Sequence, residues 1–213
     1  MQLDTGFRPS VHGFGFPNTW KDTLAGVIPS RGRCGGMVFA ALDAFAAGRS
    51  LGPEAMARAL PAHDSPLARA IFQRQFDSVV VGLGGNLAEF VRFTYLPTAS
   101  LFGIGVATRR ELLALFDALR SGRPVPLGMV SGLSLPRITS NHQVLAYAAD
   151  FGDERAIVRV YDPNHPRRDD VVLDVPMDAA EPVVERVGDR VKVWRGFFIE
   201  RYVPKGLICS APR

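Results

Sequence analysis

The stretch SNHQVLAYAADFGDERAIVRVYDPN, residues 140–164, decides the predicted fold. Its two apolar runs flank a polar turn around Gly152-Asp153, which is the pattern of two β-strands joined as a hairpin. In an antiparallel pair, the start of one strand lies beside the end of the next. We therefore expect His142, at the start of the first strand, to lie beside Asp162, at the end of the second.

Outward from this hairpin, the chain divides into a helical part and a strand-rich part. Apolar residues recur at helical spacing before it, whereas short apolar runs separated by Pro, Gly and Asp follow residue 124. Residues 1–30, broken by Gly and Pro, are predicted to be loops. Helices followed by strands indicate an α+β fold, with an N-terminal helical lobe packed on a C-terminal antiparallel sheet, in a single domain covering residues 1–213. The predicted helices are 34–47, 53–60, 66–80, 87–94 and 109–120, and the predicted strands are 125–130, 143–149, 156–161, 171–175, 190–194 and 197–202.

The charge distribution argues against a nucleic-acid partner. The formal net charge is +4 and the pI is about 9.4, but the basic pair Arg167-Arg168 is followed at once by two acids. The first 16 residues lack the pattern of a secretory signal, and no apolar run is long enough to span a bilayer. Two cysteines, Cys34 and Cys209, do not form a disulfide framework. We expect a cytoplasmic protein that uses no metal or cofactor, and the pattern does not indicate an oligomeric state.

A cysteine begins the first predicted helix directly after a Gly-rich loop, in GRCGG at residues 32–36. The positive end of the helix dipole and the unpaired N–H groups there favour the thiolate, which is the attacking form. The two glycines after Cys34 each lower helix propensity by about 1 kcal/mol relative to alanine. We interpret them as giving a substrate backbone access to the sulfur. With His142 as general base and Asp162 orienting it, Cys34 is the predicted nucleophile.

Each of these residues also has a simpler structural interpretation. A cysteine at a helix start is often a small buried apolar residue, and Asp before Pro commonly forms turns. The combination of Cys34, His142 and Asp162 on one helix and two adjacent strands favours catalysis over these separate explanations. Asn164 is an alternative orienting residue, because strand alternation would point it to the same face as Asp162.

The order of Cys34, His142 and Asp162 resembles that of papain-like cysteine peptidases. The chain is most similar to the bacteriocin-leader-processing (double-glycine) type of peptidase and its uncharacterised relatives. The resemblance implies a papain-like fold and thiol-dependent cleavage of an amide or ester in a peptide or amide substrate, without a metal or cofactor. It covers roughly residues 30–165 and depends on CGGM at 34–37, LRSGRPVPLG at 119–128, HQVLAY at 142–147 and YDP at 161–163.

One position departs from this resemblance. Papain-like enzymes usually place a glutamine six positions before the cysteine to complete the oxyanion hole, and this chain has Ile28 there. Asn18, together with the backbone N–H of Cys34, is our candidate donor. If no donor replaces the glutamine, the chain is a papain-fold binding protein without activity. An acyltransferase or a toxin-type effector would need the same three residues as a hydrolase.

Overall fold

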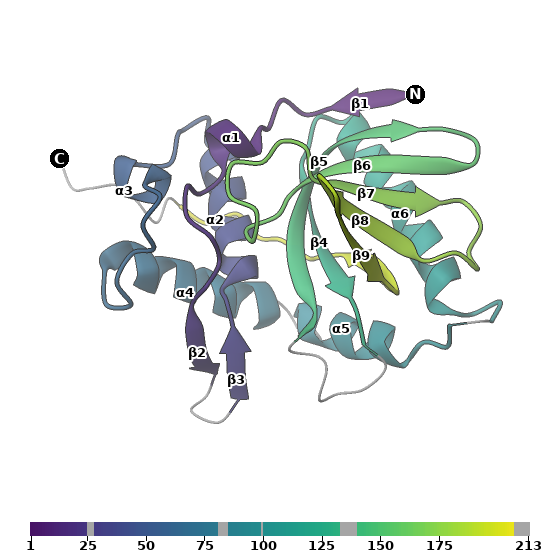
Figure 1. The fold of residues 1–213 in the computed structure, drawn as a ribbon, viewed down its shortest axis with the longest axis horizontal. Coiled ribbons are helices and arrows are strands. Elements are labelled where there is room, and N and C mark those ends of the chain that lie inside the picture. Colours follow the sequence, from purple (N-terminus) through teal and green to yellow (C-terminus); the bar gives the residue numbers. More distant parts are fainter. Residues whose placement is uncertain (25–27, 81–84, 99, 133–139, 207–213) are drawn as a thin grey trace.

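The computed structural model describes residues 1–24, 28–80, 85–98, 100–132 and 140–206 and combines helices with a curled antiparallel sheet (Figure 1). Most helices precede the sheet in sequence, as the α+β prediction expects. The helices are α1 (Pro9–His12), α2 (Cys34–Ala46), α3 (Pro53–Met56), α4 (Pro66–Val80), α5 (Gly85–Tyr95) and α6 (Ile104–Arg120). The strands are β1 (Gln2–Asp4), β2 (Lys21–Leu24), β3 (Ile28–Arg31), β4 (Val125–Val130), β5 (His142–Phe151), β6 (Arg155–Tyr161), β7 (Val172–Pro176), β8 (Val183–Val187), β9 (Arg190–Trp194) and β10 (Gly196–Ile199).

The main sheet runs in the order β10-β4-β5-β6-β7-β8-β9, and neighbouring strands in this order are antiparallel. The short strand β1 pairs with the end of β5 that β4 does not reach. Strands β2 and β3 pair only with each other and extend from the helical side of the molecule as a separate hairpin (Figure 1). Among the described helices, none is both long and apolar enough to cross a membrane.

Strand β5 lies at the centre of the molecule, with apolar residues buried on both of its faces. Leu145 and Tyr147 belong to a core formed with α2 and α4. Val144 and Ala146 point the other way, into the core between the sheet and α6. Because successive side chains of a strand alternate between faces, each face of β5 presents its own set of residues to a different set of helices. This places the start of β5 at the junction of the two cores.

The two glycines after Cys34 allow α2 to pack closely against its neighbours. A Cβ atom on Gly35 would lie 2.1 Å from Oε1 of Gln143, and one on Gly36 would lie 2.1 Å from the carbonyl oxygen of Ile71 in α4. Both glycines are buried. The expectation that they give a substrate access to the sulfur is therefore wrong: Gly35 is required because α2 approaches β5 too closely for a larger residue, and Gly36 because α2 approaches α4 too closely.

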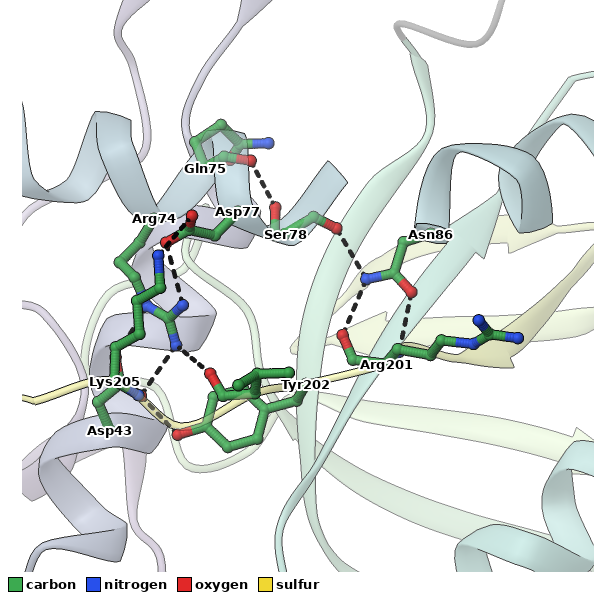
Figure 2. A network of polar contacts seen from close by, with 10 residues as sticks. Asp43, Arg74, Gln75, Asp77, Ser78, Asn86, Arg201, Tyr202 and Lys205 are labelled. Carbon is green, nitrogen blue, oxygen red and sulfur yellow. Dashed lines mark hydrogen bonds and ion pairs between the residues drawn. The ribbon is translucent and has the colours of Figure 1, made fainter. Parts of the chain in front are cut away.

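A polar network ties the segment after β10 to the helices (Figure 2). The amide of Asn86 accepts a hydrogen bond from the N–H of Arg201 at 2.8 Å and donates one to its carbonyl at 3.1 Å. The hydroxyl of Tyr202 donates to Asp43, whose carboxylate forms a buried ion pair with Arg74 at 2.8 Å. The chain beyond the sheet thus links α5, α2 and α4, and it holds the helix that begins with the candidate nucleophile.

The first 30 residues are not the continuous loop that the sequence predicts. They contain the short elements β1, α1, β2 and the start of β3. Strand β1 pairs with the distant strand β5, and β2 pairs with β3. Elements this short show no clear periodicity in the sequence. Strand β8 was also not among the strands predicted from the sequence. The predicted helix 53–60 ends at Met56, because the carbonyl of Ala55 accepts a hydrogen bond from Gly15 instead of continuing the helix. The predicted strand 197–202 ends at Ile199, after which Arg201 pairs with Asn86.

Candidate active site

Cys34 is the first residue of α2, and the residue before it is anchored on several sides. The guanidinium of Arg33 is buried, forms two hydrogen bonds with Asp22 at 2.7 and 2.8 Å, and lies over the ring of Trp20 at 4.8 Å. The backbone carbonyl of Arg33 accepts a hydrogen bond from the N–H of Met37 in the first turn of the helix. These contacts fix the entry of the chain into α2 and therefore the position of the thiol.

His142 and Asp162 meet at one end of the sheet, as the predicted hairpin requires. Nε2 of His142 lies 2.6 Å from Oδ1 of Asp162, and the two side chains are only 6% and 2% exposed. The same carboxylate oxygen accepts the backbone N–H of Asn164 at 2.7 Å. Since a carboxylate only accepts, the proton of this pair is on Nε2, which fixes the imidazole tautomer.

The proton on Nε2 leaves the other ring nitrogen of His142, Nδ1, as the acceptor, and the ring is close enough to Cys34 for the thiol to affect its pKa. Burial alone would lower the pKa of His142, but the charge and hydrogen bond of Asp162 and the contact with Cys34 together raise it well above its usual value. Burial would raise the pKa of Asp162, but the charge and hydrogen bond of His142 lower it. The site therefore favours an imidazolium held by a carboxylate.

Asn164, the alternative orienting residue, also contacts His142, but in a less suitable orientation. Nδ2 of Asn18 donates to Oδ1 of Asn164 at 3.3 Å, which turns the Asn164 NH2 group toward Nε2 of His142 at 3.2 Å. Two donors then face each other, because Nε2 already carries the proton given to Asp162. The geometry favours Asp162 as the residue that orients the imidazole. Asn164 connects the pair formed by His142 and Asp162 to Asn18.

Asn18 lies next to the nucleophile in space. Its Oδ1 accepts the backbone N–H of Arg33, and a Cβ atom on Gly32 would lie 2.3 Å from its Nδ2. Gly32 also has a φ of +86°, a conformation that glycine adopts readily. Its N–H donates to the carbonyl of Trp20 at 2.8 Å and closes the base of the β2–β3 hairpin. The structure therefore brings this predicted donor to the site despite its distance in sequence.

Ile28, at the position where the resemblance expects a glutamine, lies in β3 of the hairpin formed by β2 and β3. Asn18 and Cys34 lie on either side of this hairpin, 16 positions apart in sequence. Because the hairpin closes between Trp20 and Gly32, Asn18 lies beside Arg33, the residue that precedes Cys34.

A buried amide and a buried acid, both missed by the sequence analysis, lie behind the thiol. Cys34 Sγ lies 3.8 Å from Oε1 of Gln143, which also accepts from Nε2 of Gln75 at 3.2 Å. The NH2 group of Gln143 donates to Glu200 at 2.6 Å. Burial raises the pKa of Glu200 well above its usual value, although the Gln143 hydrogen bond opposes this, so the surroundings favour the neutral acid. Strand alternation next to His142 was the available signal for Gln143.

A tryptophan lies beside the imidazole of His142. The rings of Trp194 and His142 are nearly parallel, at 11°, with centroids 6.2 Å apart. The indole N–H donates to Glu185 at 2.6 Å, and Nζ of Lys192 lies 3.7 Å from the Trp194 ring centroid. A cavity of about 300 Å³ adjoins Trp194 on the side formed by Val193 and the start of α6. The sequence analysis named none of these residues, although the alternation in VVERV at β8 points Glu185 inward.

Within the described parts of the chain, one cluster offers atoms that could face a metal. It consists of Asp162, His165 and Glu185, with atoms within 4.8 Å of one another. Nε2 of His165 is 4.0 Å from Asp162, whose other oxygen is already taken by His142. Two of the three side chains already have hydrogen-bond partners, Asp162 in His142 and Glu185 in Trp194. Cys34 is a free thiol, whereas Cys209 lies outside the described residues.

Comparison with protein-family models, with curated proteins and with solved structures gave no match. The chemistry is therefore inferred from the geometry. A thiol at a helix start, an imidazole with a fixed tautomer and a carboxylate behind it can together attack a carbonyl carbon and transfer a proton to a leaving group.

Proposed function

We propose that the protein is a cysteine hydrolase of the papain-like type, acting on an amide or peptide bond. The observation that carries this proposal is the buried His142, which Asp162 holds through Nε2 and whose pKa is raised both by Asp162 and by the nearby thiol of Cys34. A buried structural cysteine would not need such a neighbour. The raised pKa of the His142 imidazole favours transfer of the thiol proton to it, and this supports a catalytic role for Cys34. The chain's own residues supply the nucleophile, the base and the orienting acid.

The reaction proceeds in two stages. His142 takes the thiol proton, the sulfur of Cys34 bonds to the carbonyl carbon, and the amine leaves with the proton from His142. Water then attacks the thioester, gives one proton to His142 and releases the acid, and the proton returns to the sulfur. Before the first stage, the thiol must break its hydrogen bond with Gln143. Asp162 stays ionised and keeps Nε2 protonated throughout.

The negative charge on the substrate oxygen requires donors. The backbone N–H of Cys34 and Nδ2 of Asn18 are our candidates, since Asn18 is fixed against the residue that precedes the nucleophile. Preorganised donors of this kind contribute about a hundredfold or more to the rate. Asparagine replaces the usual glutamine in this proposal.

Alkylation of Cys34 tests the proposal without knowledge of the substrate. In a Cys209→Ser background, iodoacetamide should label Cys34 rapidly at pH 6 to 7, and His142→Ala should slow this labelling at least about tenfold. His12→Ala is the control, because that ring packs on Phe7 and Phe45. An activated ester should then leave one acyl group on Cys34, detected by intact mass. Labelling that is slow and independent of His142 would favour an inactive papain-fold binding protein.

A further inference from the structure

Glu185 is a carboxyl group at a position where the sheet otherwise places apolar residues. It lies on β8 between Val183 and Val187, which point inward with it, and it is only 4% exposed. A buried acid is costly unless its polar atoms are paired. Its two neighbours are both part of the candidate site: the indole N–H of Trp194 donates to its Oε2 at 2.6 Å, and a carboxylate oxygen of Asp162 lies within 4.8 Å of one of its own oxygens.

Two buried carboxyl groups this close together favour a single shared proton, because two adjacent buried anions repel each other strongly. Asp162 is the ionised member: its Oδ1 accepts both His142 at 2.6 Å and the N–H of Asn164 at 2.7 Å. Burial first, and then the charge of Asp162, raise the pKa of Glu185. These effects favour the protonated form of Glu185, which in this assignment donates to Asp162 through one oxygen and accepts from Trp194 through the other.

We propose that Glu185 is a positioning residue for the candidate site: as a neutral acid it holds the Asp162 carboxylate toward His142 and fixes the Trp194 indole parallel to the imidazole. This inference rests on the proposed hydrolase function. The contacts form a closed ring, in which His142 meets Asp162, Asp162 meets Glu185, Glu185 meets Trp194, and Trp194 lies beside His142. One carboxyl group thus restrains both neighbours of the imidazole.

The other charged groups around Glu185 are compatible with this assignment. Besides Asp162 and His142, Lys192 faces it from β9 and is close enough for its charge to interact with both acids. His165 lies near the pair, 4.0 Å from Asp162. A cation replacing the proton between the acids is the alternative, and metal analysis of the purified protein distinguishes it.

A pair of substitutions separates positioning from mere burial. Glu185→Gln keeps an acceptor for Trp194 and an N–H donor for Asp162, whereas Glu185→Leu removes both. We expect the Leu variant to lose about tenfold or more in the labelling rate of Cys34, and the Gln variant to stay within about twofold of wild type. Asp174→Asn is the matched control, since Asp174 is a buried acid on the neighbouring strand β7 whose partner is Arg155.

Nuclear magnetic resonance gives a readout that does not need activity. In Cys34→Ser protein, the Glu185 carboxyl should titrate above the ordinary glutamate range, and Asp162→Asn should lower that pKa. The Nε2 proton of His142 should give a low-field signal that Glu185→Gln retains and Glu185→Leu shifts or loses. These signals concern the acid pair alone, so they stand even if His142-dependent labelling fails and the hydrolase proposal falls.

Three results would overturn the positioning role. The first is an ordinary pKa for Glu185 in the Cys34→Ser protein. The second is a Glu185→Gln variant as slow as a folded Glu185→Leu variant, because burial of any polar group would then explain the loss. The third is one equivalent of a bound divalent metal that chelation removes together with the low-field signal of His142. If the Leu variant does not fold, the Gln variant and the titration still decide the question.

Discussion

The backbone N–H of Arg33 donates a hydrogen bond to Oδ1 of Asn18, although the two residues are 15 positions apart in the chain. This contact settles the direction of the Asn18 amide, because Nδ2 must then face away from Arg33. Nδ2 donates one hydrogen to Asn164, and a primary amide carries a second hydrogen. The second N–H is the one we expect to reach a substrate oxygen bonded at Cys34.

Substitution of Asn18 separates oxyanion binding from thiol reactivity. Asn18→Asp keeps an oxygen for Arg33 but removes the amide donor, so the rate of acyl-enzyme formation should fall about a hundredfold or more. Alkylation of Cys34 by iodoacetamide produces no oxyanion and should not slow. Thr19→Ala, with an exposed side chain next in sequence, is the control. If both rates fall equally, Asn18 acts only by holding the chain before the nucleophile.

Asp162 and Asn164 should contribute unequally. Asp162→Asn replaces the acceptor of the Nε2 proton and permits the wrong tautomer, and we expect a loss of acylation rate on the order of 10³- to 10⁴-fold. Asn164→Ala removes a contact in which two donors face each other and should cost less than about tenfold. The acylation rates of the two variants, measured with the same activated ester, check this. The opposite ranking would make Asn164 the orienting residue.

Glu200→Gln should make stability less dependent on pH. The raised pKa of Glu200 means that the folded chain keeps a proton that the unfolded chain loses above about pH 4.3, so stability falls as pH rises through that range. Glutamine keeps an acceptor for Gln143 and cannot ionise. The variant should match wild type near pH 4 and become more stable toward pH 7, by about 1.4 kcal/mol for each unit of pKa shift. Urea unfolding at a series of pH values measures this, and a constant difference at every pH would contradict it.

The buried ion pair between α2 and α4 should contribute far more to the free energy of unfolding than an exposed ion pair does. Arg74→Ala leaves the Asp43 carboxylate buried without its charge partner, and we expect a loss of about 3 kcal/mol or more in the free energy of unfolding. Arg92→Ala, which breaks an exposed pair with Glu89, should cost about 0.5 kcal/mol or less. The two values come from urea unfolding at pH 7. Equal losses would show that the network in Figure 2 does not depend on that pair.

Elements with strong local periodicity were predictable from the sequence. Helix α4 and strands β4 and β9 have the predicted bounds, because their apolar residues repeat without interruption. The contact between His142 and Asp162 follows from a short turn, which is also a local feature. Strand β8 was missed because its inward positions include the acid Glu185 among valines, so the run does not look apolar.

Long-range relationships within the site were the part that sequence reasoning could not reach. The pairing of Gln143 with Glu200 joins residues 57 positions apart, and no spacing rule connects them. The role assigned to the glycines after Cys34 was wrong for a similar reason, since it is Ile71 and Gln143 that occupy the space beside them. Asn18 was named from its residue type, and only the closed hairpin explains its distance in sequence.

The β2–β3 hairpin leaves and re-enters the body of the protein at adjacent points, Trp20 and Gly32. Its length can therefore change during evolution without moving Asn18 relative to Cys34. A search pattern that demands a fixed number of residues between the amide and the thiol would overlook such chains. One that accepts a variable gap at this point, followed by Gly-X-Cys-Gly-Gly, would retrieve them.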